Sequence, residues 1–260
     1  MIPMPRALKR HFRASRRRRK NAIRIASAPA QTRIYAIGDV HGCFDELLDL
    51  MQMISADLLS RPVLRTIFVF TGDYVDRGPC SRDVLGLLSD LMHEENTVFL
   101  RGNHESIFLD FLKDAQVLGE WRHFGGVETL QSYGVPVGRV RQGFGFEEAR
   151  FDLLQRMPKR HVDFLLRTRA SYQAGDYFFC HAGVDPERPL DRQHHQDLMW
   201  VREKFLAHEG LMSKKIVHGH TAVEHAENHP GRINVDTCAY SSGKLSCAVL
   251  EGTDVKFLST

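Results

Sequence analysis

Aspartate, histidine and asparagine recur in five short loops of the chain, most of them beside glycine. Carboxylate, amide and imidazole groups bind divalent cations and carry protons. Without a thiolate pair, this set favours manganese, iron or zinc held through oxygen and nitrogen. The loops read Gly-Asp-Val-His-Gly at 38–42, Gly-Asp-Tyr-Val-Asp-Arg-Gly at 72–78, Arg-Gly-Asn-His-Glu at 101–105, His-Ala-Gly at 181–183 and His-Gly-His-Thr at 218–221. They predict a metal site if the fold brings them together.

Each of these loops follows a segment that is typical of a buried β-strand. The alternation of strands and helical patterns predicts an α/β domain. Ser81 is placed to cap a helix through its hydroxyl. Because ligands in open α/β sheets bind beyond the carboxyl ends of strands, the five loops are expected to meet in one crevice. The predicted strands are residues 34–37, 66–70, 97–100, 177–180 and 215–217.

The segment between Asn103 and His181 is too long to be a loop. It spans 78 residues with helical patterns at 146–156 and 160–169, so a helical insert is predicted at about 113–172. Trp121 and Arg122 precede a Gly-Gly pair and have two interpretations, either contact with substrate or closure of a core. Beyond the insert, residues 245–258 predict a β-hairpin that completes a second sheet.

Positive charge is concentrated at the beginning of the chain. Residues 1–38 hold eleven Lys or Arg and no Asp or Glu, which leaves 24 basic residues against 32 acidic ones from Asp39 onward. We expect a basic, disordered arm at 1–32 and a folded domain at 33–260. The arm also suits an anionic partner, either nucleic acid or a membrane surface, and organelle transit peptides have a similar composition.

Composition favours an aqueous, reducing compartment. The chain has 260 residues, 43% hydrophobic and 26% charged. No apolar run reaches the roughly 18 residues that a membrane span requires. The five cysteines form no Cys-x-x-Cys pair, so neither a disulfide framework nor a thiolate zinc site is indicated. Cys180 follows an apolar run and is expected to be a buried thiol. We therefore expect a cytoplasmic protein without a transmembrane segment.

The five loops, in this order, resemble the motifs of the phosphoprotein phosphatase family of metallophosphoesterases. The resemblance covers roughly residues 33–252 and is greatest to serine/threonine phosphatases of the bacterial and bacteriophage-lambda type. The symmetrical diadenosine tetraphosphate hydrolases are near relatives. The resemblance implies a sandwich of two mixed β-sheets flanked by helices, in the order α/β/β/α. A cysteine-based phosphatase is not indicated, because its thiolate phosphate loop is absent.

The resemblance also implies a site for two divalent metal ions, with Mn²⁺ as the first choice and iron or zinc as alternatives. A bridging carboxylate suits cations about 3.5–4 Å apart. The ions would acidify a bridging water, whose hydroxide attacks phosphorus in line. In this set Asp39 and His41 would hold the first ion, Asp73 would bridge, and Asn103, His181 and His220 would hold the second.

A proton donor and two arginines complete the site that the resemblance implies. His104 would protonate the leaving oxygen, and Asp76 would orient it. Arg77 would bind phosphate, and Arg202 lies where the lambda-type enzymes carry a second phosphate-binding arginine. Guanidinium groups suit a tetrahedral phosphate whose charge is spread over its equatorial oxygens.

Some residues near the motifs have more than one interpretation. His218 lies two residues before His220, so an extended backbone would direct both side chains to the same face. The Gly-His-Thr pattern selects His220 as the metal ligand, and His218 would then support it from behind. The alternatives are that His218 is the ligand instead, or that both histidines bind the metal. Asp236 either orients a ligand histidine or has a structural role. Cys238 stands where the family often has glycine, a departure that concerns the local turn. The remaining histidines are expected to face solvent, among them His123, His161, His194, His195, His208, His225 and His229.

Together these features favour a metal-dependent phosphomonoesterase that acts on phosphoserine or phosphothreonine in proteins or peptides. Asp76 discriminates among the relatives, because those that cleave diadenosine tetraphosphate commonly lack an aspartate there. The alternatives are hydrolysis of diadenosine tetraphosphate or another small phosphoester, a non-catalytic anion-binding scaffold, and a nucleic-acid-binding phosphoesterase that uses the basic arm. Every motif position is filled, which argues against the scaffold.

Overall fold

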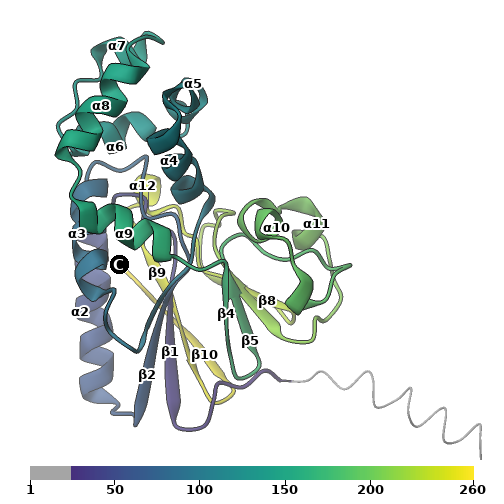
Figure 1. Ribbon diagram of the computed structural model, residues 1–260. Helices are drawn as coiled ribbons and strands as arrows, with labels where there is room; N and C mark the ends of the chain where they lie inside the picture. The colour runs from purple at the N-terminus through teal and green to yellow at the C-terminus, as the bar shows by residue number, and fades with distance from the viewer. Residues whose placement is uncertain (1–24) are drawn as a thin grey trace, which may run out of the picture.

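The computed structural model describes residues 25–260, and the predictions made for residues 1–24 of the basic arm lie outside this part of the chain. Two five-stranded sheets pack against each other, with helices on their outer faces (Figure 1). The predicted α/β sandwich of two mixed sheets is therefore confirmed. Among the residues described, no helix is long and apolar enough to cross a membrane.

The first sheet joins three parallel strands to the C-terminal hairpin. Its order is β10-β9-β1-β2-β3, in which β1, β2 and β3 are parallel and β9 is antiparallel to both β1 and β10. The hairpin exists as predicted, but the prediction that it completes the second sheet is wrong. A hairpin pattern is local and does not specify the neighbouring strand. The strands are β1 (Thr32–Ile37), β2 (Arg65–Phe70), β3 (Thr97–Phe99), β9 (Ser246–Glu251) and β10 (Asp254–Ser259).

The second sheet has a parallel centre and antiparallel edges. Its order is β4-β5-β6-β8-β7, in which β5, β6 and β8 are parallel. The predicted strands at 177–180 and 215–217 correspond to β5 and β6. The strands are β4 (Ser171–Ala174), β5 (Tyr177–Cys180), β6 (Lys215–His218), β7 (Glu227–Asn228) and β8 (Arg232–Asn234).

Alternation of side chains along the central strands explains the layered packing. Tyr177 and Phe179 of β5 belong to the core between the two sheets, whereas Phe178 and Cys180 pack with the outer helices. Successive side chains of a strand point to opposite faces, so a strand that is apolar throughout must be covered on both sides. Cys180 is fully buried as expected, and burial raises the pKa of its thiol.

Helices cover the outer face of each sheet. α2 (Phe44–Ser60), α3 (Ser81–Leu91) and α9 (Lys159–Arg167) pack on the first sheet. η3 (Leu190–Arg192), α10 (His195–Trp200) and α11 (Glu203–Leu206) lie against the second, and α12 (Ala239–Ser242) precedes β9. Ser81 begins α3 but does not cap it. Cys80 occupies the capping position, and the hydroxyl of Ser81 instead accepts a hydrogen bond from the backbone N–H of Asp76 at 3.0 Å.

The region predicted as an insert is helical and lies beside the carboxyl end of the first sheet (Figure 1). Within it, His161 is buried and its Nδ1 lies 2.7 Å from the hydroxyl of Tyr133, so the prediction that His161 faces solvent is wrong. Its partner is 28 residues away, which a local pattern does not reveal. The elements of the insert are η2 (Ala115–Val117), α5 (Leu118–Trp121), α6 (Gly126–Ser132), α7 (Gly138–Arg141), α8 (Phe146–Arg156) and α9, and α4 (Asn103–Lys113) leads into them.

Candidate active site

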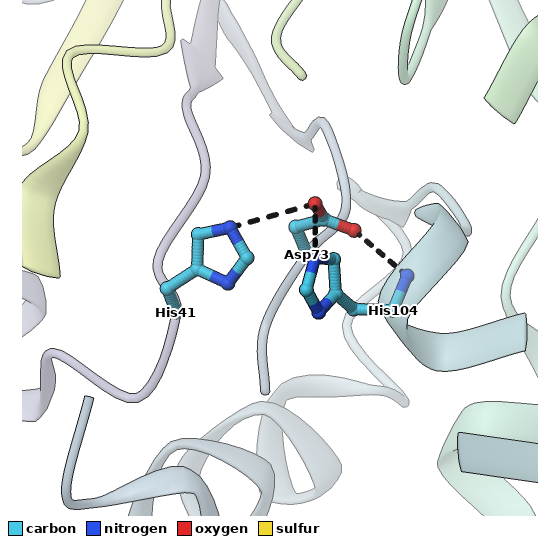
Figure 2. A group of neighbouring side chains, drawn as sticks. All are labelled: His41, Asp73 and His104. Atoms are coloured by element: carbon cyan, nitrogen blue, oxygen red, sulfur yellow. Dashed lines mark hydrogen bonds and ion pairs between the residues drawn. The ribbon is translucent and has the colours of Figure 1, made fainter. Parts of the chain in front are cut away.

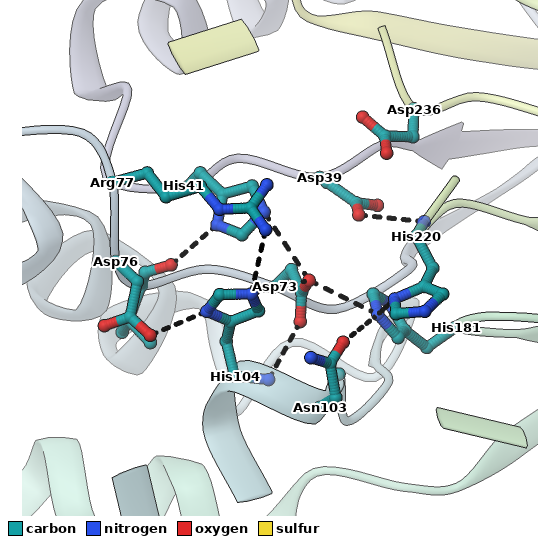
Figure 3. Close-up of polar contacts among 12 residues, drawn as sticks. Asp39, His41, Asp73, Asp76, Arg77, Asn103, His104, His181, His220 and Asp236 are labelled. Carbon is teal, nitrogen blue, oxygen red and sulfur yellow. Dashed lines mark hydrogen bonds and ion pairs between the residues drawn. The ribbon is translucent and has the colours of Figure 1, made fainter. Parts of the chain in front are cut away.

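The five predicted loops meet at one place, beyond the carboxyl ends of parallel strands from both sheets (Figure 3). Their backbone is unusual. Seven non-glycine residues of the described chain have a positive φ, and five of them are His41, Asp73, Asp76, Arg77 and His220. Such conformations cost about 1–3 kcal/mol each and persist only where the surrounding contacts impose them. The strain is therefore concentrated where the polar side chains converge.

Asp73 lies between two groups of buried side chains that could hold metal. Its Oδ2 lies 3.5 Å from Nε2 of His41 and 3.8 Å from Nε2 of His104 (Figure 2). On the other side, the same oxygen lies 3.3 Å from Nε2 of His181. The first group is His41, Asp73 and His104, and the second is Asp73, His181 and His220. Because one carboxylate belongs to both groups, the arrangement is consistent with a binuclear metal site.

The second group also includes the side chain of Asn103. Nε2 of His181 lies 3.0 Å from Oδ1 of Asn103 and 3.2 Å from Nδ1 of His220. Asp39, by contrast, lies outside both groups. Its carboxylate accepts hydrogen bonds from the backbone N–H of His220 at 2.9 Å and from the hydroxyl of Thr71 at 3.3 Å. The structure therefore places Asp39 beside the predicted ligands, directed toward the loop that carries His220.

Hydrogen bonds to backbone carbonyls orient two of the imidazole rings. Nδ1 of His41 lies 2.8 Å from the carbonyl oxygen of Val75, and Nδ1 of His181 lies 3.0 Å from that of Thr71. A ring that donates from Nδ1 presents the lone pair of Nε2 to a metal. Both Nε2 atoms face Asp73. The possible metal ligands are thus carboxylate and amide oxygens and imidazole nitrogens, with no thiolate. This set of ligands fits first-row divalent cations.

Burial and charge set the protonation of this group. Burial lowers the pKa of His41 and His220 to about 3, so both imidazoles are neutral, the form that binds metal. Burial disfavours charge on His181 and Asp73 as well, but their mutual attraction outweighs it. The pKa of His181 rises to about 10 and that of Asp73 falls well below its usual range. Burial, followed by the charge of Asp236, raises the pKa of Asp39. Metal binding must therefore displace protons from this site.

His104 and Asp76 form a hydrogen-bonded pair beside the first group. Nδ1 of His104 lies 2.6 Å from Oδ2 of Asp76, and both side chains are buried. Burial opposes protonation of His104, but the charge of Asp73 and the bond to Asp76 outweigh it and raise the pKa of His104. An imidazole that keeps its proton near neutral pH can deliver it to a leaving group.

Trp121 lies in the core of the insert and not on an open surface. Its side chain is fully buried, and its indole N–H donates to Oδ2 of Asp76 at 2.7 Å. Arg122 donates to the backbone carbonyls of Gly119 and Arg141, both at 3.1 Å. The interpretation of Trp121 as a substrate contact is therefore wrong, because the side chain points into the insert and toward Asp76. The other interpretation, that Trp121 closes a core, agrees with its burial but did not include the hydrogen bond to Asp76.

The two predicted phosphate-binding arginines approach the site from opposite sides. Nη2 of Arg77 lies 3.4 Å from Nε2 of His104, and Nε of Arg202 lies 3.1 Å from Nε2 of His220. The guanidinium of Arg77 is also held 4.7 Å from the ring centroid of Tyr240, a cation–π contact. Both arginines thus carry positive charge to the edge of the histidine cluster.

The comparison with known proteins agrees with this geometry. A sequence model that represents the calcineurin-like phosphoesterases matches residues 32–248, which is most of the chain. The chain belongs to the calcineurin-like phosphoesterase family. Metal-assisted hydrolysis of phosphoester bonds is accordingly the chemistry of this site.

Relatives of this phosphoesterase have different substrates. Serine/threonine-protein phosphatase 1 of Salmonella typhimurium is 27% identical over 223 residues, which cover 84% of this chain and 92% of the relative. An asymmetrical bis(5'-nucleosyl)-tetraphosphatase of Bacillus cereus is 26% identical over 231 residues, which cover 81% of this chain and 87% of the relative. A solved serine/threonine phosphatase from Saccharomyces cerevisiae superimposes with a TM-score of 0.52 at 16% identity, covering 98% of this chain and 90% of its own, and supports the fold alone.

His218, Asp236 and Cys238 lie near the phosphoesterase site and differ in what they contact. His220, and not His218, lies with Asp73, while Nε2 of His218 is buried without a hydrogen-bond partner. Asp236 accepts the backbone N–H of Cys238 at 2.9 Å and, among residues 25–260, makes no hydrogen bond to a histidine, which favours its structural role. Cys238 has φ of 58°, the left-handed region that favours glycine.

Two residues that support the loops were not predicted from the sequence. Glu105 is fully buried and its carboxylate accepts the backbone N–H groups of Asp73, Tyr74 and Gly102 at 2.7–2.9 Å. Its position three residues after Gly102, as in a capping box, was the available signal. Thr129 is also buried, and its hydroxyl donates to Oδ1 of Asp76 at 2.6 Å. No local pattern indicates this second contact.

His220 and His218 provide a matched pair for testing the ligand assignment. We expect His220→Asn to lose about one metal ion per chain and at least about 100-fold in phosphoesterase activity, since even residues that only orient a ligand contribute about 10–100-fold. His218→Asn should keep its metal content, because its ring faces Phe205. Elemental analysis of both proteins after gel filtration checks the prediction. Equal loss of metal in the two variants would contradict it.

Proposed function

We propose that this phosphoesterase hydrolyses phosphoserine and phosphothreonine monoesters in proteins or peptides. The observation that carries the proposal is the buried pair of His104 and Asp76, with 2.6 Å between Nδ1 and Oδ2. The leaving group of a serine or threonine ester is an alkoxide, a strong base that needs a proton as the bond breaks. A nucleotide leaving group is a much weaker base and gains less from a dedicated acid. The pair therefore favours the monoester substrate.

We propose that two divalent cations bind at the shared carboxylate, with Mn²⁺ as the first choice and iron or zinc as alternatives. When bound, they would acidify a water molecule and offset negative charge on the phosphate oxygens. The residues that would hold them are Asp39 and His41 for one ion, Asp73 between the two, and Asn103, His181 and His220 for the other.

The remaining roles belong to side chains of this chain alone. His104 holds a proton at Nε2 for the leaving oxygen, and Asp76 fixes the ring through Nδ1. Arg77 and Arg202 bind phosphate oxygens from opposite sides and align the ester bond with His104. Burial of the pair keeps bulk water away from the proton that is transferred. The match to a serine/threonine phosphatase over 84% of this chain supports this assignment.

Hydrolysis of a dinucleoside polyphosphate is the second candidate. The Bacillus cereus tetraphosphatase, matched over 81% of this chain, is the observation that favours it. A tetraphosphate offers the same metal and arginine contacts as a monoester. The two candidates differ in how much they need His104, since their leaving groups differ in basicity.

The test is phosphate release by metal-free protein resupplied with Mn²⁺, with a phosphoserine peptide and diadenosine tetraphosphate as parallel substrates. We expect the peptide to be hydrolysed with the higher kcat/KM and Asp39→Asn to be inactive. Cleavage of the dinucleotide alone would replace the proposal with the second candidate. Turnover of neither substrate would remove both and leave the smaller phosphoesters.

A further inference from the structure

A buried tryptophan of the helical insert touches the residue that orients the proposed acid. The indole N–H of Trp121 donates to Oδ2 of Asp76 at 2.7 Å, and the same oxygen lies 2.6 Å from Nδ1 of His104. The other oxygen, Oδ1, accepts the hydroxyl of Thr129 at 2.6 Å. The carboxylate of Asp76 is fully buried. Its direction is therefore set by these three donors, two of which belong to the insert.

The indole of Trp121 is itself fixed in place. It stacks on Phe108 with centroids 5.1 Å apart and an interplanar angle of 21°, and its centroid lies 4.9 Å from that of Phe111. On another side it lies so close to Gly126 that a Cβ at that position would overlap the ring. The N–H can point only in the direction that these neighbours allow, which is toward Asp76.

The backbone around Asp76 shows why a fixed donor matters. Asp76 has φ of 73°, and its neighbour Arg77 has φ of 69°, so this loop is held in a strained conformation. The insert supports it directly, because the backbone N–H of Arg77 donates to the carbonyl of Gly125 at 3.3 Å. Without the indole N–H, Oδ2 would keep His104 as its sole side-chain donor, and the carboxylate could turn about its terminal torsion.

We propose that Trp121 is a positioning residue that holds Asp76, and through it His104, in the geometry for proton delivery to the leaving group. The inference rests on the proposed function in that it takes His104 as the acid. In this proposal the helical insert helps to hold the pair of His104 and Asp76 in place. Trp121 is fully buried, so we expect it to act on turnover through Asp76 and His104.

The test compares Trp121→Phe, which keeps an aromatic ring and removes the N–H, with Tyr133→Phe. Tyr133 is a suitable control, because its hydroxyl makes a buried hydrogen bond of 2.7 Å to His161 in the same insert and touches no site residue. The substrates are phenyl phosphate, whose leaving group is basic, and 2,4-dinitrophenyl phosphate, whose leaving group needs no proton. We expect Trp121→Phe to lower kcat about tenfold on phenyl phosphate and less than about twofold on the dinitrophenyl ester.

Two further measurements separate positioning from a general structural defect. In a His104→Asn background, Trp121→Phe should have no additional effect on phenyl phosphate, because the residue through which it acts is gone. In proton NMR spectra of the metal-free protein, the imidazole N–H resonance of His104 should move in Trp121→Phe and stay unchanged in Tyr133→Phe. Equal losses on both esters, additivity with His104→Asn, or an unmoved resonance would overturn the inference.

Failure of the proposed function gives a different result. If the wild-type protein released no phosphate from the phosphoserine peptide, the proposed function would fall, and the inference about proton delivery would fall with it. If it hydrolysed that peptide and both aryl esters, and Trp121→Phe behaved like Tyr133→Phe, the proposed function would stand and the inference alone would be overturned.

Discussion

Replacing Asp73 by asparagine is expected to remove both metal ions and to lower phosphate release at least about 1,000-fold, since each bound cation contributes several kcal/mol to transition-state stabilisation. Oδ2 of Asp73 lies within 3.3–3.8 Å of an Nε2 atom in His41, His104 and His181. An amide in its place is neutral and cannot bridge two cations. Elemental analysis and initial rates with added Mn²⁺ check the prediction.

Asp57→Asn is the control for this variant. Asp57 is a largely buried carboxylate of α2 that bonds Tyr35 at 2.6 Å and Arg61 at 3.0 Å, in a network separate from the site. It should keep both metal ions and full activity in the fraction that folds. Two ions per chain in Asp73→Asn would exclude Asp73 as the bridging ligand. Loss of one ion alone would assign it to a single metal.

The positions of the site residues were predictable because their signals are local. Asp39, Asp73 and His181 each come within three residues of the end of a buried strand, and parallel strands bring such ends together. These strands belong to two different sheets, and the predicted sandwich brings the ends of both sheets to one place. Contacts between distant segments were not predictable in this way.

Trp121 and the C-terminal hairpin illustrate what local patterns leave out. An aromatic residue before a Gly-Gly pair is compatible with a groove or a core, and its partner Asp76 is 45 residues away. The hairpin pattern at 245–258 specifies only that two strands pair with each other. It does not specify that β9 also pairs with β1, whose residues lie more than 200 positions earlier in the chain. In both cases the missing information is a tertiary contact, which neither propensity nor spacing encodes.

His104→Asn is expected to lower kcat on a phosphoserine peptide by about 10²–10⁴-fold, the usual contribution of a general acid. Asparagine cannot deliver a proton, although it can fill part of the space. His104 also belongs to a group of potential ligands with His41 and Asp73, so the variant distinguishes an acid from a ligand. Kinetics of the peptide and elemental analysis of the same preparation provide both readouts.

Retention of both ions with a large loss of kcat would assign His104 to proton transfer. Loss of an ion would instead identify His104 as a metal ligand, and another group would have to supply the proton. The geometry favours the first outcome. Nε2 of His104 is 3.8 Å from Oδ2 of Asp73, the longest of the three such distances, while its Nδ1 makes a 2.6 Å bond to Asp76. A ring held by a carboxylate on one side and facing Arg77 on the other is arranged to hand a proton to a phosphoester oxygen that Arg77 binds.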